Sequence, residues 1–509
     1  RLGGGESAAA SSSPAPAEQP AASGPAGTEA VVVPPQRLEF SETELPAPTG
    51  TVAAGTTVTL LGGGPLAPLV AERLRAAGAQ PETVPDGDVP ERTGEAVLYL
   101  QAFAAPDTQL PDAFPLFQAV LAAGPKQLLA VERRSEGAAT GLRGFFRSVA
   151  REYDETAATL VEVGSEDTPE AVADILVAEL GATEREPVVL AEGGRRRALK
   201  LIPTDLGAVA ATGAGPAGDG VAEAAAAGLD RDSVVLLAGG ARGITARFAR
   251  TIAATGRCRI ELLGRTPVPS PQEDPATASA RGRDELRSAL ISSGMKSPAE
   301  IERAMSAVLA EREVRETLAA LRESGSQARY RSVDVLDVEA VRAAVKEIHA
   351  EHGRLDGVVY AAGVIEDKLI AEKSPESFRR VFTTKADGAR VLLDAVGALP
   401  EGPRFAVLFG SIAAALGNRG QCDYAAANDA LEELGRRWSN EDRRGLTVHW
   451  GPWAASETNG GMVTPELMRS YAARGIKLID PEEGPLSLLR ELAWGAPTVH
   501  AVVSAASGW

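Results

Sequence analysis

Residues 238–245 read Ala-Gly-Gly-Ala-Arg-Gly-Ile-Thr, and this stretch decides the fold. An apolar run that begins at Ser233 precedes it and predicts a strand, and the pattern from Ile244 to Thr255 predicts a helix. Expected strands then alternate with expected helices along the chain, at 259–263, 330–333, 357–360, 405–409, 447–450 and 498–503. This alternation predicts a seven-stranded parallel sheet with helices on both faces, which is the doubly wound α/β fold.

The part of the chain before Ser233 contains another unit of the same class. Strand-like runs alternate with helical stretches there, at 57–61, 66–77, 96–100, 127–131, 159–163 and 169–180. The Gly-rich loop Leu60–Leu66 lies between a strand and a helix, as a nucleotide-binding loop would. No Tyr-plus-Lys pair follows it in this unit, so we interpret the loop as a vestigial turn.

The domain organisation follows from these patterns. We predict two Rossmann-like, doubly wound units, at 31–228 and 229–509, with an Ala- and Gly-rich junction at 208–228. Residues 1–30 are rich in Ala, Pro, Ser and Gly and cannot bury enough apolar surface to fold, so they predict an interdomain linker. A chain that starts in such a linker is expected to be part of a longer protein.

Residues 266–325 interrupt the alternation of the second unit and predict a helical insertion. Ser297 as a cap, Pro298 at the first position and Glu300 as the partner in a capping box predict the start of its long helix. Apolar side chains then recur on roughly one stripe, at Ile301, Met305, Val308, Leu318 and Leu321. The stripe predicts packing against a partner surface, either of this chain or of a neighbouring subunit.

The loop at 238–245 is predicted to bind a dinucleotide, because its glycines let backbone amides approach a pyrophosphate at the positive end of a helix. At the end of the second strand, where NAD enzymes tend to carry an acid, the chain has Arg265, and Arg242 points to the same region. Two cations and no acid favour NADPH over NADH, the alternative being two solvated surface charges. The predicted cofactor-binding residues are Gly239, Gly240, Arg242, Gly243, Ile244, Arg265, Asp334, Val335, Ala361, Ala362 and Gly363.

Four polar residues form the candidate catalytic group. Ser411 ends a predicted strand, Tyr424 follows at a helix start, Asn428 lies one turn later, and Lys385 lies on the preceding helix. These residue types suit carbonyl reduction, with Tyr424 as the proton donor and a nearby ammonium that lowers the pKa of the phenol. Ser411 would hold the carbonyl oxygen, and Asn428 would order a relay water. Taken singly, each residue also has an ordinary structural explanation.

Composition excludes several other classes of protein. The formal net charge of −17 disfavours a nucleic-acid partner. No run approaches the roughly 20 apolar residues of a membrane-spanning helix. Cys258 and Cys422 are the two cysteines, so no disulfide framework is expected and a cytoplasmic location is favoured. The four histidines form no ligand cluster in the sequence, so no metal site is predicted.

Two segments carry a family resemblance. Residues 407–411 and 420–428 resemble the ketoreductase domains of type I polyketide and polyunsaturated fatty acid synthases, which belong to the short-chain dehydrogenase/reductase superfamily. That superfamily more commonly has Lys four residues after the Tyr, whereas synthase ketoreductases exchange the Lys and the Asn, as Lys385 and Asn428 do here. Residues 450–453, followed by 460–462, are similar to the segment that leads into the substrate lid, and Pro452 joins the predicted cofactor-binding residues.

The resemblance implies a function and partners for the whole chain. It implies that residues 31–228 are a structural half without cofactor and that residues 229–509 are the catalytic half. The implied reaction is NADPH-dependent reduction of a 3-oxoacyl thioester carried by the phosphopantetheine arm of an acyl carrier protein. Neighbouring synthase domains are further expected partners. The insertion and Thr245 look most like polyunsaturated fatty acid and other iterative synthases.

The sequence also departs from the family pattern. Ala238 replaces a usual Thr and Thr245 replaces a usual third Gly, which would be consistent with reduced activity. Residues 365–367 read Ile-Glu-Asp where one stereochemical class has Leu-Asp-Asp, and Leu416 stands where the other class has Trp. The resemblance therefore implies the (3R), B-type product.

Three hypotheses remain at this point. The first is an active ketoreductase, and the second is a catalytically silent module with the same fold that is kept for architecture. The third is a free-standing reductase of small ketones, which the linker and the additional α/β unit disfavour.

Overall fold

The computed structural model of the chain describes residues 31–90, 92–104, 109–134, 140–204, 219–270, 272–454, 469, 471–472, 476–494 and 500–504. The predicted linker at 1–30, the junction as far as residue 218 and the segment 460–462 lie outside the described residues. Within the described ranges, no helix combines the length and the apolar character that crossing a membrane requires.

The second unit contains the predicted seven-stranded sheet. Its strands lie in the order β12 (Ala328–Ser332), β11 (Arg259–Gly264), β10 (Val234–Ala238), β13 (Gly357–Tyr360), β14 (Phe405–Ser411), β15 (Arg444–Trp450) and β17 (His500–Ser504), and all neighbours are parallel. The chain order reverses between β10 and β13, and doubly wound sheets bind ligands at such a switch point. The predicted fold class is confirmed.

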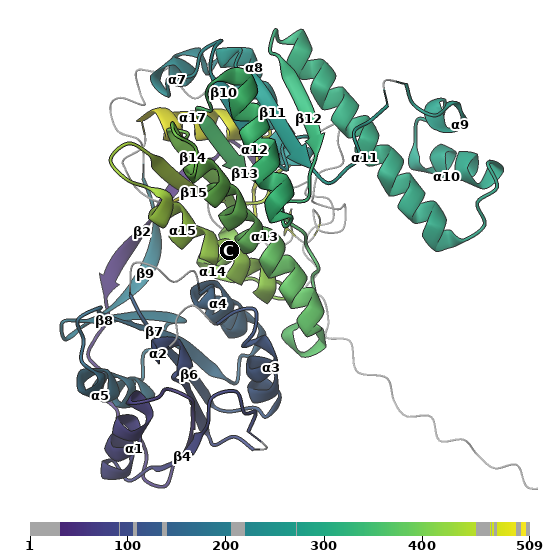
Figure 1. Ribbon diagram of the computed structural model, residues 1–509. Helices are drawn as coiled ribbons and strands as arrows, with labels where there is room; N and C mark the ends of the chain where they lie inside the picture. The colour runs from purple at the N-terminus through teal and green to yellow at the C-terminus, as the bar shows by residue number, and fades with distance from the viewer. Residues whose placement is uncertain are drawn as a thin grey trace, which may run out of the picture.

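The first unit contains a parallel sheet of its own, and two antiparallel strands join it to the second. Its strands lie in the order β4 (Gln80–Val84), β3 (Thr57–Leu61), β5 (Ala96–Tyr99), β6 (Gln127–Arg133), β7 (Ala157–Val163) and β8 (Val188–Glu192). Strand β9 (Arg195–Pro203) pairs with β8, β2 (Gln36–Glu44) pairs with β9, and β17 pairs with β2. One hydrogen-bonded sheet of 15 strands therefore runs through both units (Figure 1).

Helices cover the strands of both units. The first unit has α1 (Leu66–Ala76), α2 (Gln101–Ala104), α3 (Phe114–Ala122), α4 (Leu142–Glu152) and α5 (Pro169–Leu180). The second has α7 (Val221–Ala226), α8 (Gly243–Gly256), α12 (Val338–His352), α13 (Pro375–Gly397), α14 (Ile412–Leu416), α15 (Cys422–Trp438) and α17 (Glu483–Trp494). Alternate residues of β10 face opposite sides: Leu237 packs in a cluster with Phe248 of α8, and Leu236 in a cluster with Val345 of α12. Helices therefore cover both faces, as predicted.

The two units share an aromatic cluster. Phe114 of α3 stacks on Phe378 of α13, with ring centroids 4.3 Å apart, and Phe145 of α4 lies at the edge of the same ring. Both Phe114 and Phe378 are fully buried. Burial of such large apolar side chains is a main source of folding free energy, so the helices of the first unit are fixed against those of the second.

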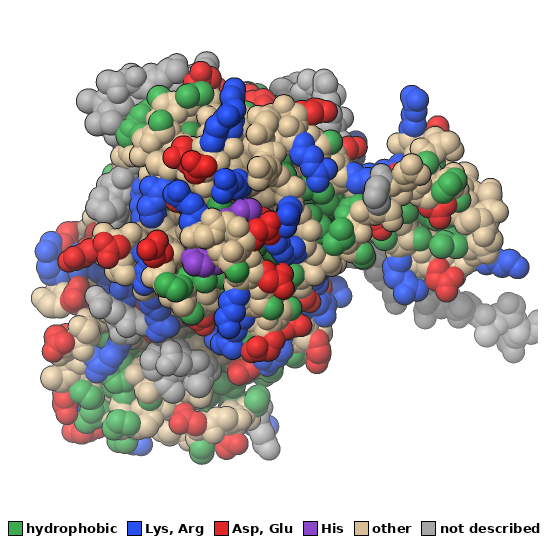
Figure 2. Space-filling model, turned by 45° about the horizontal axis from the view of Figure 1, so that its top comes forward, with side chains coloured by type: hydrophobic (Ala, Val, Ile, Leu, Met, Phe, Trp, Pro, Cys, Tyr) green, Lys and Arg blue, Asp and Glu red, His purple; other side chains and the backbone are tan. Residues whose placement is uncertain are grey.

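The predicted insertion is helical and consists of α9 (Pro275–Ala278), α10 (Arg283–Ser292) and α11 (Pro298–Glu323). Met305, in the outer half of α11, packs with Leu286 of α10, whereas Val314 and Leu321 join the core of the second unit. The partner surface of the helix is thus this chain itself. The predicted capping box is wrong, because the Ser297 side chain makes no capping hydrogen bond. The insertion stands out from the body in Figures 1 and 2.

Two short elements of the range predicted as the first unit contact the second. Strand β1 (Val32–Val33) pairs with β16 (Leu478–Ile479). Glu223 of α7 forms an ion pair with Arg490 of α17 at 3.6 Å. The boundary at residue 228 stays a prediction. Figure 2 shows acidic and basic side chains intermingled on the face that it presents.

Candidate active site

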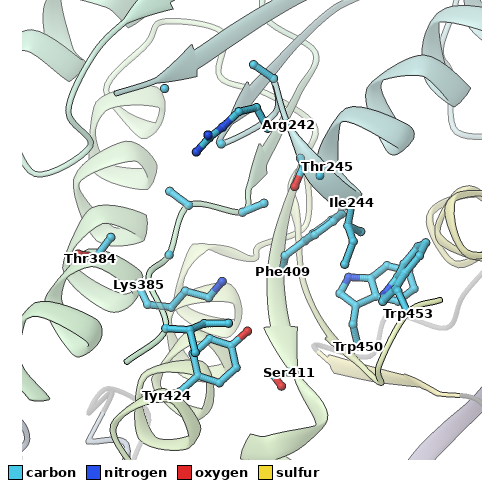
Figure 3. A pocket seen from close by; sticks show the side chains of 18 of the residues that line it. Arg242, Ile244, Thr245, Thr384, Lys385, Phe409, Ser411, Tyr424, Trp450 and Trp453 are labelled. Atoms are coloured by element: carbon cyan, nitrogen blue, oxygen red, sulfur yellow. The ribbon is translucent and has the colours of Figure 1, made fainter. Parts of the chain in front are cut away.

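A cavity of about 860 Å³ opens at the carboxyl ends of the strands of the second unit. The loops after β10, β11, β13, β14 and β15 line it, together with α11 and α13. Figure 3 shows Arg242 on one side of this space and Tyr424 with Ser411 on another. The cavity therefore lies at the switch point of the sheet, and it is lined both by the predicted cofactor loop and by predicted catalytic residues.

The glycine-rich loop after β10 passes close to the loop after β13. Gly239 has a φ of +80°, and a Cβ added there would lie 2.8 Å from the Ala362 nitrogen. Gly243 has a φ of +59° and begins α8, so its amide belongs to the positive end of that helix. Gly240 has a different role, because a Cβ added there would lie 2.4 Å from the Leu237 Cβ.

Ten of the twelve predicted cofactor-binding residues line the cavity: Gly239, Arg242, Gly243, Ile244, Arg265, Val335, Ala361, Ala362, Gly363 and Pro452. Gly240 packs behind the loop instead. Asp334 is exposed, and its side chain accepts a hydrogen bond from the Leu336 amide at 3.0 Å. Their binding roles stay predictions, and these two are the residues whose placement gives them least support.

Three of the four predicted catalytic residues line one wall of the cavity. Ser411 is the last residue of β14, Tyr424 lies in the first turn of α15, and Lys385 lies on α13. Figure 3 shows the Lys385 nitrogen and the Tyr424 oxygen directed into the same space, with Ser411 on the neighbouring strand. The doubly wound topology brings these residues together although up to 39 positions separate them in the sequence.

Asn428 lies one turn beyond Tyr424 and behind the cavity wall. It is fully buried, and its Nδ2 donates to the Tyr424 carbonyl oxygen at 2.7 Å. Its Oδ1 is buried and accepts no hydrogen bond from the described residues. Because a buried acceptor without a partner is costly, this atom is suited to accept from a water molecule beside Tyr424.

Burial sets the protonation of the Lys385 and Tyr424 side chains. Burial alone lowers the pKa of Lys385 to about 8. Burial raises the pKa of Tyr424, and hydrogen bonds with the Ser411 and Asn428 side chains offset part of that rise. The sequence-based expectation of a lowered phenol pKa is therefore wrong, because loss of solvation outweighs the stabilisation of the phenolate.

A buried ion pair adjoins Tyr424 and was missed by the sequence reasoning. Lys373 donates to the Asp423 Oδ2 at 2.7 Å and to the Glu366 carbonyl oxygen at 2.6 Å, and the two charged side chains are at most 1% exposed. Burial raises the pKa of Asp423 to about 6, and the Lys373 ammonium limits that rise. The pair fixes the loop after β13 against the start of α15. No local pattern singles out Lys373, because the same loop also contains Glu366, Asp367 and Lys368.

Glu313 of α11 was also missed. It lines the cavity, and its Oε1 accepts a hydrogen bond from the Gly243 amide at 2.9 Å. The contact joins residues 70 positions apart, so no local pattern could have indicated it. It places a carboxylate at an amide that the sequence assigns to the pyrophosphate.

One cluster of side chains outside the cavity consists of residue types that can bind a metal ion. Glu261, Glu351 and His352 bring their ligand atoms together, which the spacing of the histidines did not predict. Arg331 forms ion pairs with both glutamates, and His352 contacts Glu261 at 2.8 Å. Since these contacts already balance the carboxylate charges, we interpret the group as a structural network.

Comparisons with known proteins agree with this geometry. Residues 233–455 match the model of the KR domain family. The chain is 35% identical over 286 residues to part of a polyunsaturated fatty acid synthase from Thraustochytrium sp., an alignment that covers 54% of this chain and 10% of that protein. It is 31% identical over 396 residues to the polyketide synthase ThaG of Burkholderia thailandensis, which covers 75% of this chain and 6% of that protein. The chain thus spans a tenth or less of the length of these relatives.

Solved structures show the same fold over nearly the whole chain. A crystal structure of an N-terminal ketoreductase from the macrolactin assembly line has a TM-score of 0.67 at 18% identity and covers 92% of each chain. A structure of A-type ketoreductases from a modular polyketide synthase has a TM-score of 0.67 at 22% identity and covers 93% of each. Residues 233–455 are therefore a KR domain, within a chain that has the fold of polyketide synthase ketoreductases.

Proposed function

We propose that this chain catalyses the NADPH-dependent reduction of a 3-oxoacyl thioester to the 3-hydroxyacyl thioester. The observation that carries the proposal is the convergence of Lys385, Ser411 and Tyr424 on a cavity that also contains the glycine-rich loop (Figure 3). A phenol, a hydroxyl and an ammonium in one such space suit the transfer of a proton to a carbonyl oxygen. The dinucleotide supplies the hydride when it is bound.

Each residue has a defined part in the reaction. Tyr424 donates its proton to the carbonyl oxygen as hydride reaches the carbonyl carbon, so that new O–H and C–H bonds replace the C=O π bond. Its raised pKa keeps the proton on the phenol at neutral pH until that step. The Ser411 hydroxyl orients the carbonyl oxygen, Lys385 stabilises the phenolate that Tyr424 leaves, and Asn428 holds the water through which a proton returns.

The residues of the cavity fit a phosphorylated dinucleotide. A Cβ added at Gly239 would collide with the Ala362 nitrogen at 2.8 Å, and one added at Gly363 would make a tight contact of 3.3 Å with the Lys385 Nζ, so both positions favour glycine. Arg242 and Arg265 line the cavity, and a guanidinium is suited to bind a ribose phosphate. The proposal therefore names NADPH rather than NADH.

The proposed substrate is carried by an acyl carrier protein within a larger synthase. Support comes from the relatives, which are a polyunsaturated fatty acid synthase and a polyketide synthase. The low cysteine content, with Cys258 and Cys422 both free, agrees with a cytoplasmic setting. The (3R) configuration of the product stays a prediction from residues 365–367.

Replacement of Tyr424 by Phe tests the proposal. We expect Y424F to lose about 10²- to 10⁴-fold in turnover of a 3-oxoacyl thioester, because the proton donor is gone, and to keep its affinity for NADPH. Y153F is the matched control, since Tyr153 lies outside the cavity. Loss of NADPH consumption and retention of NADPH fluorescence binding would support the assignment, whereas full activity of Y424F would refute it.

The alternative of a silent module has two observations in its favour. The Glu313 carboxylate occupies the Gly243 amide, and Thr245, at 5% exposure, crowds the start of α8 where a glycine is usual in the family. A silent module should give no saturable change in NADPH fluorescence. Saturable binding together with thioester reduction would exclude it.

A further inference from the structure

The segment that connects Ser411 to Tyr424 is held by the first unit of the chain. Four side chains of α4 bind its backbone, and they do so at every second residue. The contacts are Arg147 Nη1 to the Ala414 oxygen at 2.7 Å, Arg151 Nε to the Leu416 oxygen at 3.2 Å, the Asn418 amide to Ser148 Oγ at 3.3 Å, and the Gly420 amide to Glu152 Oε1 at 2.9 Å. Helix α4 therefore acts as a template for this connection.

The close fit of the two backbones supports the same conclusion. Gly417 has a φ of +70°, and a Cβ added there would lie 2.3 Å from the Arg147 carbonyl oxygen. Only glycine permits both this conformation and this approach. The connection between Ser411 and Tyr424 is thus shaped to α4 rather than to solvent.

Glu152 differs from the other three side chains because it binds two segments. Its Oε2 accepts from the Ile370 amide at 2.9 Å, and Ile370 begins the 3-10 helix η2 (Ile370–Glu372) in the loop after β13. Gln118 of α3 holds the same loop from the first unit, through the Ile370 oxygen at 2.7 Å and the Lys373 oxygen at 2.9 Å. One carboxylate therefore joins the loop after β13 to the turn before α15.

Both joined segments form walls of the cavity on the side of Tyr424. Ile365 and Asp367 line it from the loop after β13, and Asn418 and Gln421 line it from the turn before α15. Gln421 Nε2 donates to both Asp367 oxygens at 3.0 Å, so the walls also touch each other across the mouth. Glu152 itself does not line the cavity and contacts the walls from behind.

We propose that Glu152, a residue of the half predicted to lack a cofactor, is a positioning residue that sets how the acyl substrate lies against Tyr424. The inference rests on the proposed function. Its consequence is that Glu152 governs the rate with the thioester and the configuration of the product but leaves the cofactor untouched. Replacement of the carboxylate deprives two amides of their acceptor, and the walls lose their fixed separation.

Glu152→Ala and Glu152→Gln test the proposal, with Glu155→Gln as the control because Glu155 is exposed three residues further on. We expect E152A to lose about 10- to 100-fold in kcat/KM for a 3-oxoacyl thioester and to form a mixture of hydroxyl configurations. E152Q keeps one oxygen acceptor for two amides and should lie between E152A and the native protein. The dissociation constant of NADPH should change by less than about twofold in both variants, which also shows that they are folded.

A second readout separates failure of this inference from failure of the proposed function. Hydrogen exchange of the Ile370 and Gly420 amides should accelerate in E152A and not in E155Q, whether or not the native protein reduces thioesters. An active native protein whose E152A variant keeps native kcat/KM, a single product configuration and slow exchange would overturn the inference. If E152A fails to bind NADPH, the same measurements on E152Q decide.

Discussion

The two units of this chain contain the same glycine-rich turn in two different surroundings. In the first unit, Gly62 follows β3 and its amide bonds to the Val84 oxygen of β4; in the second, Gly239 follows β10 and its amide bonds to the Leu263 oxygen of β11. The next strand is also equivalent, since the amides of Leu100 and Ala361 bond to the last residues of β3 and β10. The backbone frame of the candidate dinucleotide site is therefore present twice.

The side chains around the two turns decide which frame has a cavity. Leu100 is fully buried, and a Cβ added at Gly63 would lie 2.4 Å from the Leu100 Cβ, whereas Ala361 lines the open cavity of the second unit. Two residues beyond the paired Val84 and Leu263 stand Asp86 and Arg265, of opposite charge. One large apolar residue and one charge therefore distinguish a packed turn from a candidate phosphate site.

The largest effect is expected when the apolar difference is reversed. Ala361→Leu should fill the cavity beside Gly239 and weaken NADPH binding more than about 100-fold, because the side chain takes the space of the ligand. Leu100→Ala in the first unit should lower the free energy of unfolding by about 2–5 kcal/mol without creating NADPH binding, since Asp86 remains. Fluorescence titration and urea unfolding measure the two effects. Native affinity in A361L would contradict the comparison.

The charge difference predicts the choice of cofactor. Arg265→Ala should raise the dissociation constant of NADPH about 10- to 100-fold and leave that of NADH nearly unchanged. The reason is that only NADPH carries a phosphate at the 2′ position of its adenosine ribose. NADH serves as the internal control. Equal weakening of both cofactors would instead assign Arg265 to the fold or to the pyrophosphate.

The position of a buried lysine predicts the pH dependence. Helix α13, between β13 and β14, carries Lys385. Helix α3, between β5 and β6 of the first unit, has no charged residue. Burial lowers the pKa of Lys385 to about 8, so the ammonium is lost as pH rises through this value. The kcat/KM for NADPH-dependent reduction should fall by up to about tenfold per unit above pH 8. Lys385→Arg, which keeps its charge, should lack this descending limb; a flat native profile to pH 10 would contradict the role.

The smallest effect concerns the contact that the insertion adds to the second turn. Glu313→Gln removes the negative charge at the Gly243 amide and should tighten NADPH binding about two- to fivefold at low salt. The gain should shrink at high ionic strength, because salt screens exposed charges. Glu316→Gln, an exposed residue on the same helix, is the control. Weaker binding in E313Q would show that the carboxylate contacts the cofactor favourably.

Much of the second unit could be predicted because local signals and packing agree there. Helix α12 has local signals at both ends: Asp337 caps its start by accepting from the Ala340 amide, and Gly353 ends it with a φ of +73°. The convergence of Ser411 and Tyr424 in the candidate site was also predictable, since they lie at a strand end and a helix start that the topology brings to one edge.

The missing parts depend on contacts between distant segments. Strand β2 acquires its neighbours only when β9 and β17 are in place, so no local pattern could indicate its pairing. Glu152 contacts Ile370 across 218 positions and Gly420 across 268. The burial that reverses the expected shift of the Tyr424 pKa is likewise a property of the assembled helices.

The shared sheet has a practical consequence for cloning. The family match covers residues 233–455 and ends soon after β15. A fragment with these bounds lacks β17, which pairs with β15, and also lacks β2, which pairs with β17. A recombinant fragment with these ends would leave the β15 edge free to associate with other chains, and aggregation during expression would be the expected result. Fragments for crystallisation or assay should therefore span residues 31–504, so that the strands that close the edge travel with the site.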